Sequence, residues 1–224
     1  MKQANTKIYA EIDKEKIARL PQVLFEGRIV VVETAESAQM AVEYLKSENI
    51  IGIDTETRPS FKRGQVNKVA LLQLSTLDTC FLFRLNKMGL PDCLKELLED
   101  RVQLKVGLSL RDDSHALHGR TVYNDGRYLD LQDYAASFGI IDKSLQKLYA
   151  NLFGRRISKN QRLSNWEASA LSRAQQRYAA TDAWACVKLY NRLKELGENH
   201  NYILIPHIDE GKLASKVVGD MFSA

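Results

Sequence analysis

Short apolar runs alternate with amphipathic stretches along most of the chain. Several of the runs, such as residues 50–53, are apolar on both sides, which is typical of strands buried within a sheet. Two of them are separated only by a short polar link at residues 76–79, which predicts a hairpin. The predicted strands span residues 29–32, 50–53, 68–75, 80–85, 104–108 and 127–131. A hairpin inside an otherwise alternating pattern predicts an α/β fold whose mixed sheet contains one antiparallel strand, flanked by helices.

Helical spacing of apolar residues fills the intervals between these strands and continues after them. The predicted helices span residues 35–46, 91–98, 112–118, 131–138, 144–152 and 173–196. Ser172 and Gln175 have the spacing of a capping box at the start of the last helix, and Gly197 predicts its end. Residues 154–165 are polar, basic and without periodicity, which predicts a loop.

The chain contains no internal repeat, low-complexity tract or linker. We therefore expect one domain at residues 29–197, with an N-terminal extension at 1–28 and a C-terminal tail at 198–224. No apolar run approaches the roughly 18 residues that a membrane span needs, and the polar N-terminus shows no signal peptide. The three cysteines are few and widely spaced, which indicates reduced thiols. We expect a cytoplasmic protein, or a nuclear one if the source is a eukaryote.

The formal net charge of +4 is too small by itself to indicate binding to nucleic acid. The charge is unevenly distributed, however. Between Glu56 and Asp78 every charged residue is basic, and residues 142–177 contain eight basic residues against two acidic ones. These segments either solvate helices and loops or form a surface that binds a polyanion. Charge alone leaves both interpretations open.

Two acidic residues come directly after the apolar run at residues 50–53. Because side chains alternate along a strand, Asp54 and Glu56 point to the same face. Two neighbouring carboxylates repel each other unless a cation or a shared proton lies between them. The pair is either a solvated strand end or part of a site for a hard metal ion with oxygen ligands.

A third acid, Asp182, lies within the buried stripe of the last predicted helix. The stripe comprises Ala174, Tyr178, Asp182, Ala185, Leu189 and Leu193. A buried carboxylate without a partner costs several kcal/mol, so Asp182 requires a cation or a hydrogen bond. Tyr178 lies one turn earlier and either satisfies Asp182 as a core residue or shares a functional cavity with it.

Asp112 and Asp113 follow the predicted strand at residues 104–108, at the sheet end where α/β proteins commonly bind ligands. They also suit the N-terminus of a helix, where acids interact favourably with the helix dipole. If the three acidic groups converge, the site has four carboxylates and a tyrosine. Such an oxygen-only set suits Mg²⁺ or Mn²⁺ better than zinc.

Three motifs containing these acids occur in the order IGIDTET, KVGLSLRDDSHAL and LSRAQQRYAATDAWA. They are accompanied by NKVALLQLST, LDLQDYA and ISKNQRLSNWEASALS. Together they resemble the 3′–5′ exonuclease domain of the RNase D and Werner-syndrome exonuclease type, the tyrosine subtype of the DEDD superfamily. The resemblance covers residues 29–196. It implies a ribonuclease H-like exonuclease fold and metal-dependent hydrolysis of phosphodiester bonds from the 3′ end of DNA or RNA, which releases nucleoside 5′-monophosphates.

Carried over by position, the resemblance implies that Asp54, Glu56 and Asp182 bind one divalent ion. Asp54 bridges to a second ion, which Asp113 holds partly through water, and Tyr178 orients the attacking water. Asp113 is chosen over Asp112 because the motif places its acid at the sixth position after Gly107. Two Mg²⁺ or Mn²⁺ ions are expected as cofactors.

The basic segments are then expected to grip the backbone of a single-stranded 3′ end without reading its bases. Expected substrate contacts are Thr55 (by its backbone), Lys68, Leu108, His115 and Arg162. His115 stands where Werner-type relatives carry an aromatic residue.

Two alternatives remain. The first is a catalytically inactive nucleic-acid-binding or scaffold domain of the same fold, although four carboxylates impede phosphate binding unless metal is present. The second is a phosphohydrolase of the haloacid-dehalogenase kind with Asp54 as nucleophile, against which Glu56 stands in place of the expected aspartate.

Overall fold

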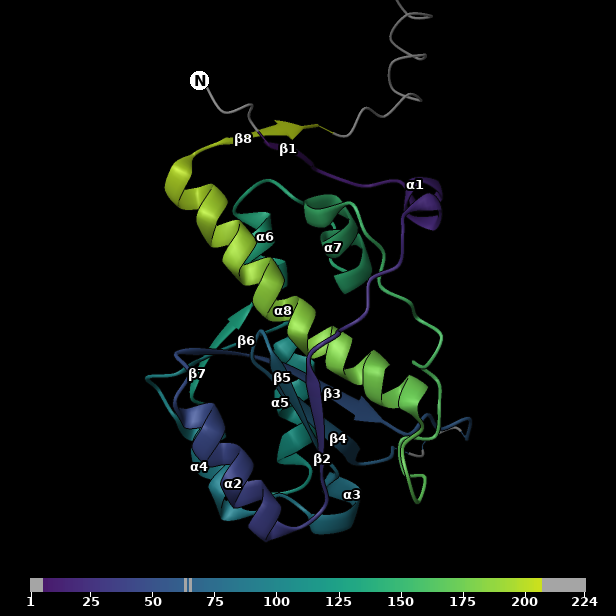
Figure 1. Ribbon diagram of the computed structural model, residues 1–224, viewed down its shortest axis with the longest axis vertical. Coiled ribbons are helices and arrows are strands. Elements are labelled where there is room, and N and C mark those ends of the chain that lie inside the picture. The colour runs from purple at the N-terminus through teal and green to yellow at the C-terminus, as the bar shows by residue number, and fades with distance from the viewer. Residues whose placement is uncertain (1–5, 63, 65, 207–224) are drawn as a thin grey trace, which may run out of the picture.

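The computed structural model describes residues 6–62, 64 and 66–206. Their centre is a six-stranded sheet with the strand order β2-β5-β4-β3-β6-β7 (Figure 1). The strands are β2 (Arg28–Val32), β3 (Ile50–Thr57), β4 (Val69–Ser75), β5 (Thr79–Phe83), β6 (Leu104–Gly107) and β7 (Arg127–Asp130). β4 is antiparallel to both of its neighbours, and the other adjacent pairs are parallel. The predicted mixed sheet with one antiparallel strand is therefore confirmed.

The helices occupy both faces of this sheet. They are α1 (Lys14–Arg19), α2 (Ala35–Lys46), α3 (Leu85–Met88), α4 (Asp92–Glu99), α5 (Leu110–His118), α6 (Leu131–Ala136), α7 (Leu145–Phe153) and α8 (Arg173–Asn199). Apolar residues of α2, α4 and α5 form one core with the sheet. The long helix α8 crosses the other face, where α6 and α7 pack against its C-terminal half (Figure 1). Within the described residues no helix is long and apolar enough to cross a membrane.

The start of α8 is confirmed and its predicted end is wrong. Ser172 and Gln175 form the capping box, each side chain accepting a hydrogen bond from the other's backbone N–H. The helix continues through Gly197 to Asn199, and His200 adopts the left-handed conformation with φ of 49°. Gly197 instead gives room to a neighbour, because a Cβ atom there would lie 3.2 Å from the ring of Phe138.

A second, smaller sheet joins the two ends of the described chain. β1 (Thr6–Tyr9) pairs in parallel with β8 (Tyr202–Ile205), next to the end of α8 (Figure 1). Ile8 of β1 is fully buried in the core that α6, α7 and α8 share. Part of the expected extension and part of the expected tail are thus integral to the fold. Residues 1–5 and 207–224 of these two segments lie outside the described residues, and the expected boundaries at 29 and 197 stay a prediction.

The contact between α8 and β3 is unusually close at one position. A Cβ atom built on Gly52 of β3 would lie 1.9 Å from the carbonyl oxygen of Ala183 in α8. Only glycine, which has no Cβ atom, permits this approach. Because Gly52 precedes Asp54 by two residues and Ala183 follows Asp182, the contact brings two of the predicted site residues together.

Candidate active site

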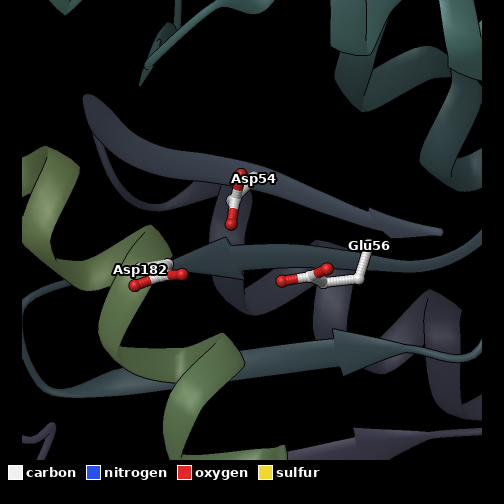
Figure 2. A group of neighbouring side chains, drawn as sticks. All are labelled: Asp54, Glu56 and Asp182. Carbon is white, nitrogen blue, oxygen red and sulfur yellow. The ribbon is translucent and has the colours of Figure 1, made fainter. Parts of the chain in front are cut away.

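Three acidic side chains converge where α8 crosses the end of β3. Asp54 and Glu56 extend from β3 and Asp182 from α8, and one carboxylate oxygen of each lies within 4.8 Å of the others (Figure 2). Glu56 and Asp182 are buried and Asp54 is half-buried. We call these three residues the acidic cluster. The predicted convergence of the strand acids with the helix acid is thus observed.

Burial and mutual repulsion disfavour the charged forms of the cluster. Burial, followed by the charges of Asp113, Asp182 and Glu56, raises the pKa of Asp54 well above its usual range. Burial and the charges of Asp182 and Asp113 raise the pKa of Glu56 to about 9, against the opposing charge of Arg162. Without a cation, the cluster therefore holds protons at neutral pH.

The charged form of Asp182 is also disfavoured, and one of its carboxylate oxygens lacks a partner in the described part of the chain. Burial raises its pKa to about 7, although the Tyr178 hydroxyl and the charge of Lys159 act in the opposite direction. Its Oδ1 atom is buried and has no hydrogen-bond partner in the described part of the chain. An unpartnered oxygen facing two further carboxylates fits a hard divalent cation, which takes oxygen ligands. The acidic cluster thus fits a metal ion.

Asp113 lies beside the cluster, in the first turn of α5. It accepts a 2.6 Å hydrogen bond from the hydroxyl of Thr55, the β3 residue between the two strand acids. Burial raises the pKa of Asp113 to about 6, opposed by the Thr55 bond and assisted by the charges of Asp112 and Asp130. Asp113 is not part of the three-residue group, but its charge acts on Asp54 and Glu56. Asp112 is exposed.

The turn that positions Asp113 is held by Asp130 at the end of β7. One carboxylate oxygen of Asp130 accepts from the backbone N–H of Leu110 at 2.9 Å, and the other accepts from Gln132 at 2.9 Å. The side chain of Gln132 in turn donates to the hydroxyl of Ser109, which has a left-handed φ of 59°. Sequence reasoning missed Asp130, although an aspartate between a strand and a helix in LDLQDYA is a typical N-cap.

Tyr178 is buried one turn before Asp182. Its ring packs against that of the fully buried Trp166, with 6.0 Å between the ring centroids. Burial, followed by the charges of Asp182 and Glu56, raises the pKa of Tyr178 well above its usual value. Its hydroxyl thus remains protonated and adjoins the acidic cluster. The predicted buried stripe is correct from Tyr178 onward, but Ala174, in the first turn of α8, is exposed because it lines an open surface pocket.

A cavity of about 320 Å³ opens next to Tyr178 and Asp182. Its lining includes basic and polar residues of the loop before α8 and of the turn before α7. The lining residues are Leu108, Ser109, Lys143, Ser144, Leu145, Gln146, Ile157, Ser158, Lys159, Arg162, Tyr178 and Asp182. Leu108 and Arg162 were predicted. Lys143 and Lys159 were recognised only as part of a basic segment, because nothing local shows which lysine of a loop faces a site.

The loop at residues 154–172 is fixed over the cavity by side chains from elsewhere in the fold. Gln146 donates to the carbonyl oxygen of Ile157 at 2.8 Å, and Gln175 donates to that of Asn165 at 3.1 Å. The buried guanidinium of Arg84 donates to the carbonyl oxygen of Ala168. The sequence predicted a loop at residues 154–165, and the structure has no helix or strand from 154 to 172. These hydrogen bonds give the basic side chains of the loop a fixed position.

The remaining predicted substrate contacts are not among the residues that line this cavity. Lys68 and His115 are exposed. The Thr55 side chain is bonded to Asp113, and its predicted backbone contact with substrate stays a prediction.

Comparison with known proteins gives consistent matches. Residues 29–198 match the family described as 3′-5′ exonuclease. An Arabidopsis thaliana 3′-5′ exonuclease is 33% identical over 192 residues, which cover 79% of this chain and 67% of that protein. The mouse bifunctional 3′-5′ exonuclease/ATP-dependent helicase WRN is 29% identical over 85% of this chain, but the match covers only 14% of WRN.

Solved structures share the fold. The exonuclease domain of Aedes aegypti Nibbler superposes with a TM-score of 0.71 and 21% identity, covering 81% of this chain and 94% of that domain. Escherichia coli RNase D superposes with a TM-score of 0.67 and 20% identity, covering 76% of this chain and 46% of RNase D. These similarities confirm the expected ribonuclease H-like exonuclease fold. With a family match over most of its length, the chain belongs to the 3′-5′ exonuclease family.

Proposed function

We propose that this chain removes nucleotides one at a time from the 3′ end of single-stranded nucleic acid, using two Mg²⁺ or Mn²⁺ ions and releasing nucleoside 5′-monophosphates. The observation that carries the proposal is the position of the acidic cluster beside the basic cavity. Carboxylates repel a phosphate unless cations neutralise them, whereas Lys143, Lys159 and Arg162 attract one. The two features are compatible only if metal ions lie between the acids and the substrate.

In this proposal, Asp54, Glu56 and Asp182 hold one ion, and Asp54 and Asp113 hold the second. When bound, the ions supply an activated water and offset the charge that develops on the attacking and leaving oxygens. The Tyr178 hydroxyl, kept protonated by its burial and by the cluster, orients the attacking water. The hydrogen bond from Thr55 fixes the rotamer of Asp113.

The substrate contacts follow from the cavity. Leu108 offers an apolar surface beside the acids, and Arg162 and Lys159 lie on the loop that covers them. We propose that the terminal nucleotide enters here and that the basic side chains contact its backbone phosphates. We also propose that Lys68 and His115 contact the bound nucleic acid and that Thr55 contacts the terminal nucleotide by its backbone.

Two structural neighbours support a nucleic-acid substrate. One is a Trypanosoma brucei RNase D in complex with RNA U12, and the other is Brucella melitensis NrnC bound to pGG. The haloacid-dehalogenase alternative finds no such support, since the family and the fold neighbours are exonucleases.

The experiment uses 5′-labelled single-stranded DNA and RNA of one sequence, incubated with Mn²⁺, with Mg²⁺ or with EDTA. We expect a ladder that shortens by single nucleotides from the 3′ end with metal and no shortening in EDTA. A 3′-phosphate on the oligonucleotide or a closed circular strand should block or abolish the reaction, which distinguishes an exonuclease from an endonuclease. Intact substrate with either metal, together with band shifts on a native gel, would instead identify an inactive binding domain.

A further inference from the structure

One fully buried side chain next to the acidic cluster has no partner. Gln73 in β4 is 0% exposed, and neither its Oε1 nor its Nε2 atom makes a hydrogen bond in the described part of the chain. A buried donor or acceptor that is left unpaired destabilises the fold. An apolar side chain of the same size would avoid this cost, so the amide requires an explanation.

The strand register places Gln73 directly opposite Asp54. In the antiparallel pair of β3 and β4, Gly52 faces Ser75, Asp54 faces Gln73, and Glu56 faces Leu71. Directly opposite residues have Cβ atoms about 4.5–5.5 Å apart and point to the same face. That face is covered by α8, so Gln73 lies beside Asp54 under the helix that carries Asp182.

Few hydrogen-bond donors lie near the carboxylate of Asp54 in the described part of the chain. Within the described residues, the backbone N–H of Thr55 favours its charged form, while the charges that act on it are those of the acids Asp113, Asp182 and Glu56. A carboxylate that bridges two ions must keep one orientation, and metal-binding carboxylates are commonly held by hydrogen bonds from a second layer of residues. A hydrogen bond to the ionised form of a carboxylate is also stronger than one between neutral groups.

We propose that Gln73 is a positioning residue for the metal site, whose Nε2–H group donates to the carboxylate of Asp54 when the ions are bound. The inference rests on the proposed function, since it requires that Asp54 is a metal ligand. It explains the presence of an amide in β4, whose other residues are apolar or small. In this proposal the amide is unpaired in the metal-free protein and gains its partner when the bound ions fix the orientation of Asp54.

The test is Gln73→Met, which preserves length and removes both polar atoms. Calorimetric titration with Mn²⁺ should show affinity weakened by about 10–100-fold, the range typical for loss of a second-layer partner. Thermal unfolding in EDTA should show a midpoint equal to or above that of the parent, because the buried unpaired amide is gone. Weaker metal binding in an equally stable protein is a result that a packing role does not produce.

Gln103→Met is the matched control. Gln103 is also buried, but its Nε2 donates to the carbonyl oxygens of Leu45 at 2.6 Å and Glu48 at 2.8 Å. It precedes Leu104, which pairs with Ile50 at the start of β3, whereas the acids lie at the end of that strand. This variant should unfold at lower temperature and bind Mn²⁺ with parental affinity. The two glutamines thus predict opposite combinations of stability and metal affinity.

A second variant covers the case in which Gln73→Met does not fold. Gln73→Asn keeps the amide but shortens its reach by one methylene group, so Mn²⁺ affinity should again fall. Parental Mn²⁺ affinity in either folded variant overturns the positioning role while leaving the exonuclease proposal intact. A parent protein that neither binds Mn²⁺ nor hydrolyses oligonucleotides overturns both.

Discussion

The two faces of the central sheet are built from alternate residues of the same strands, yet they differ in kind. Toward α2 and α4, the buried core positions of β3, β4 and β5 include the apolar side chains of Ile51, Ile53, Leu72, Leu74, Phe81 and Phe83. Toward α8, the intervening positions include glycine, acids, an amide and small polar groups, namely Gly52, Asp54, Glu56, Gln73, Ser75 and Cys80. One face forms a dry core, and the other contains most of the buried groups that lack a partner.

The difference shows how a single sheet separates stability from function. On the dry face, burial of apolar surface stabilises the fold by about 25 cal/mol per Å² and requires no hydrogen-bond partners. The α8 face contains carboxylates whose burial raises their pKa values, together with the unpaired Gln73 amide and Asp182 Oδ1. Substitutions on the two faces should therefore affect stability and activity in opposite ways.

The largest effect is expected from Asp54→Asn or Asp182→Asn on the α8 face. Each removes a charged metal ligand, so hydrolysis of a labelled oligonucleotide should fall to the background of the assay. Because a repelled buried carboxylate is lost as well, the unfolding temperature in EDTA should hold or rise. Asp112→Asn, at an exposed acid near the site, is the control and should keep near-parental turnover. Substantial turnover in either cluster variant would contradict the metal assignment.

Tyr178→Phe retains the ring that packs on Trp166 and removes only the hydroxyl. Turnover should slow by about 10²–10⁴-fold, the range for a positioned catalytic group, with little change in Mn²⁺ affinity or unfolding temperature. Single-turnover rates with saturating oligonucleotide give the comparison. An unchanged rate would make Tyr178 a core residue of the same kind as those on the dry face.

Leu74→Ala is the corresponding change on the dry face. Leu74 is fully buried and pairs with Ile53, the residue that precedes Asp54 in β3. Truncation should lower the free energy of unfolding by about 2–5 kcal/mol in a urea titration. Turnover per folded molecule should stay near that of the parent, measured well below the unfolding midpoint. A loss of turnover in fully folded protein would show that the faces are coupled.

The last prediction concerns the pH dependence of stability without metal. Groups whose pKa is raised by folding stabilise the fold in their protonated form, and this contribution is lost as pH rises through the folded-state values of about 6 for Asp113, 7 for Asp182 and 9 for Glu56. In EDTA, stability should thus fall between about pH 5 and 9, with a slope of up to about 1.4 kcal/mol per pH unit for each proton released. Thermal scans with Mn²⁺ should show a flatter profile. If stability falls equally steeply with pH in EDTA and in Mn²⁺, the acidic cluster does not bind the ion.

Local patterns were enough to predict the sheet, its antiparallel strand and the acids at the end of β3. Alternation along a strand and capping at Ser172 depend on neighbouring residues, which a sequence displays directly. The pairing of β1 with β8 joins segments about 200 residues apart and leaves no local trace. Likewise, Lys159 acts on Asp182, and Gln73 faces Asp54, only through the tertiary structure.

The close approach at Gly52 fixes how near α8 lies to the strand that carries Asp54 and Glu56. The contact is between backbone atoms, so no rotamer change could relieve a methyl group at position 52, and α8 itself would have to move. Such a shift would change the separation between Asp182 and Asp54. The distance of 1.9 Å between a Cβ atom at position 52 and the Ala183 oxygen would have to grow by about 1 Å or more to become an allowed contact. A displacement of this size is larger than the difference between the ligand distances of Mg²⁺, about 2.0–2.1 Å, and Ca²⁺, about 2.3–2.6 Å. The absence of a side chain at position 52 therefore keeps Asp182 within reach of the strand acids with which it would share an ion.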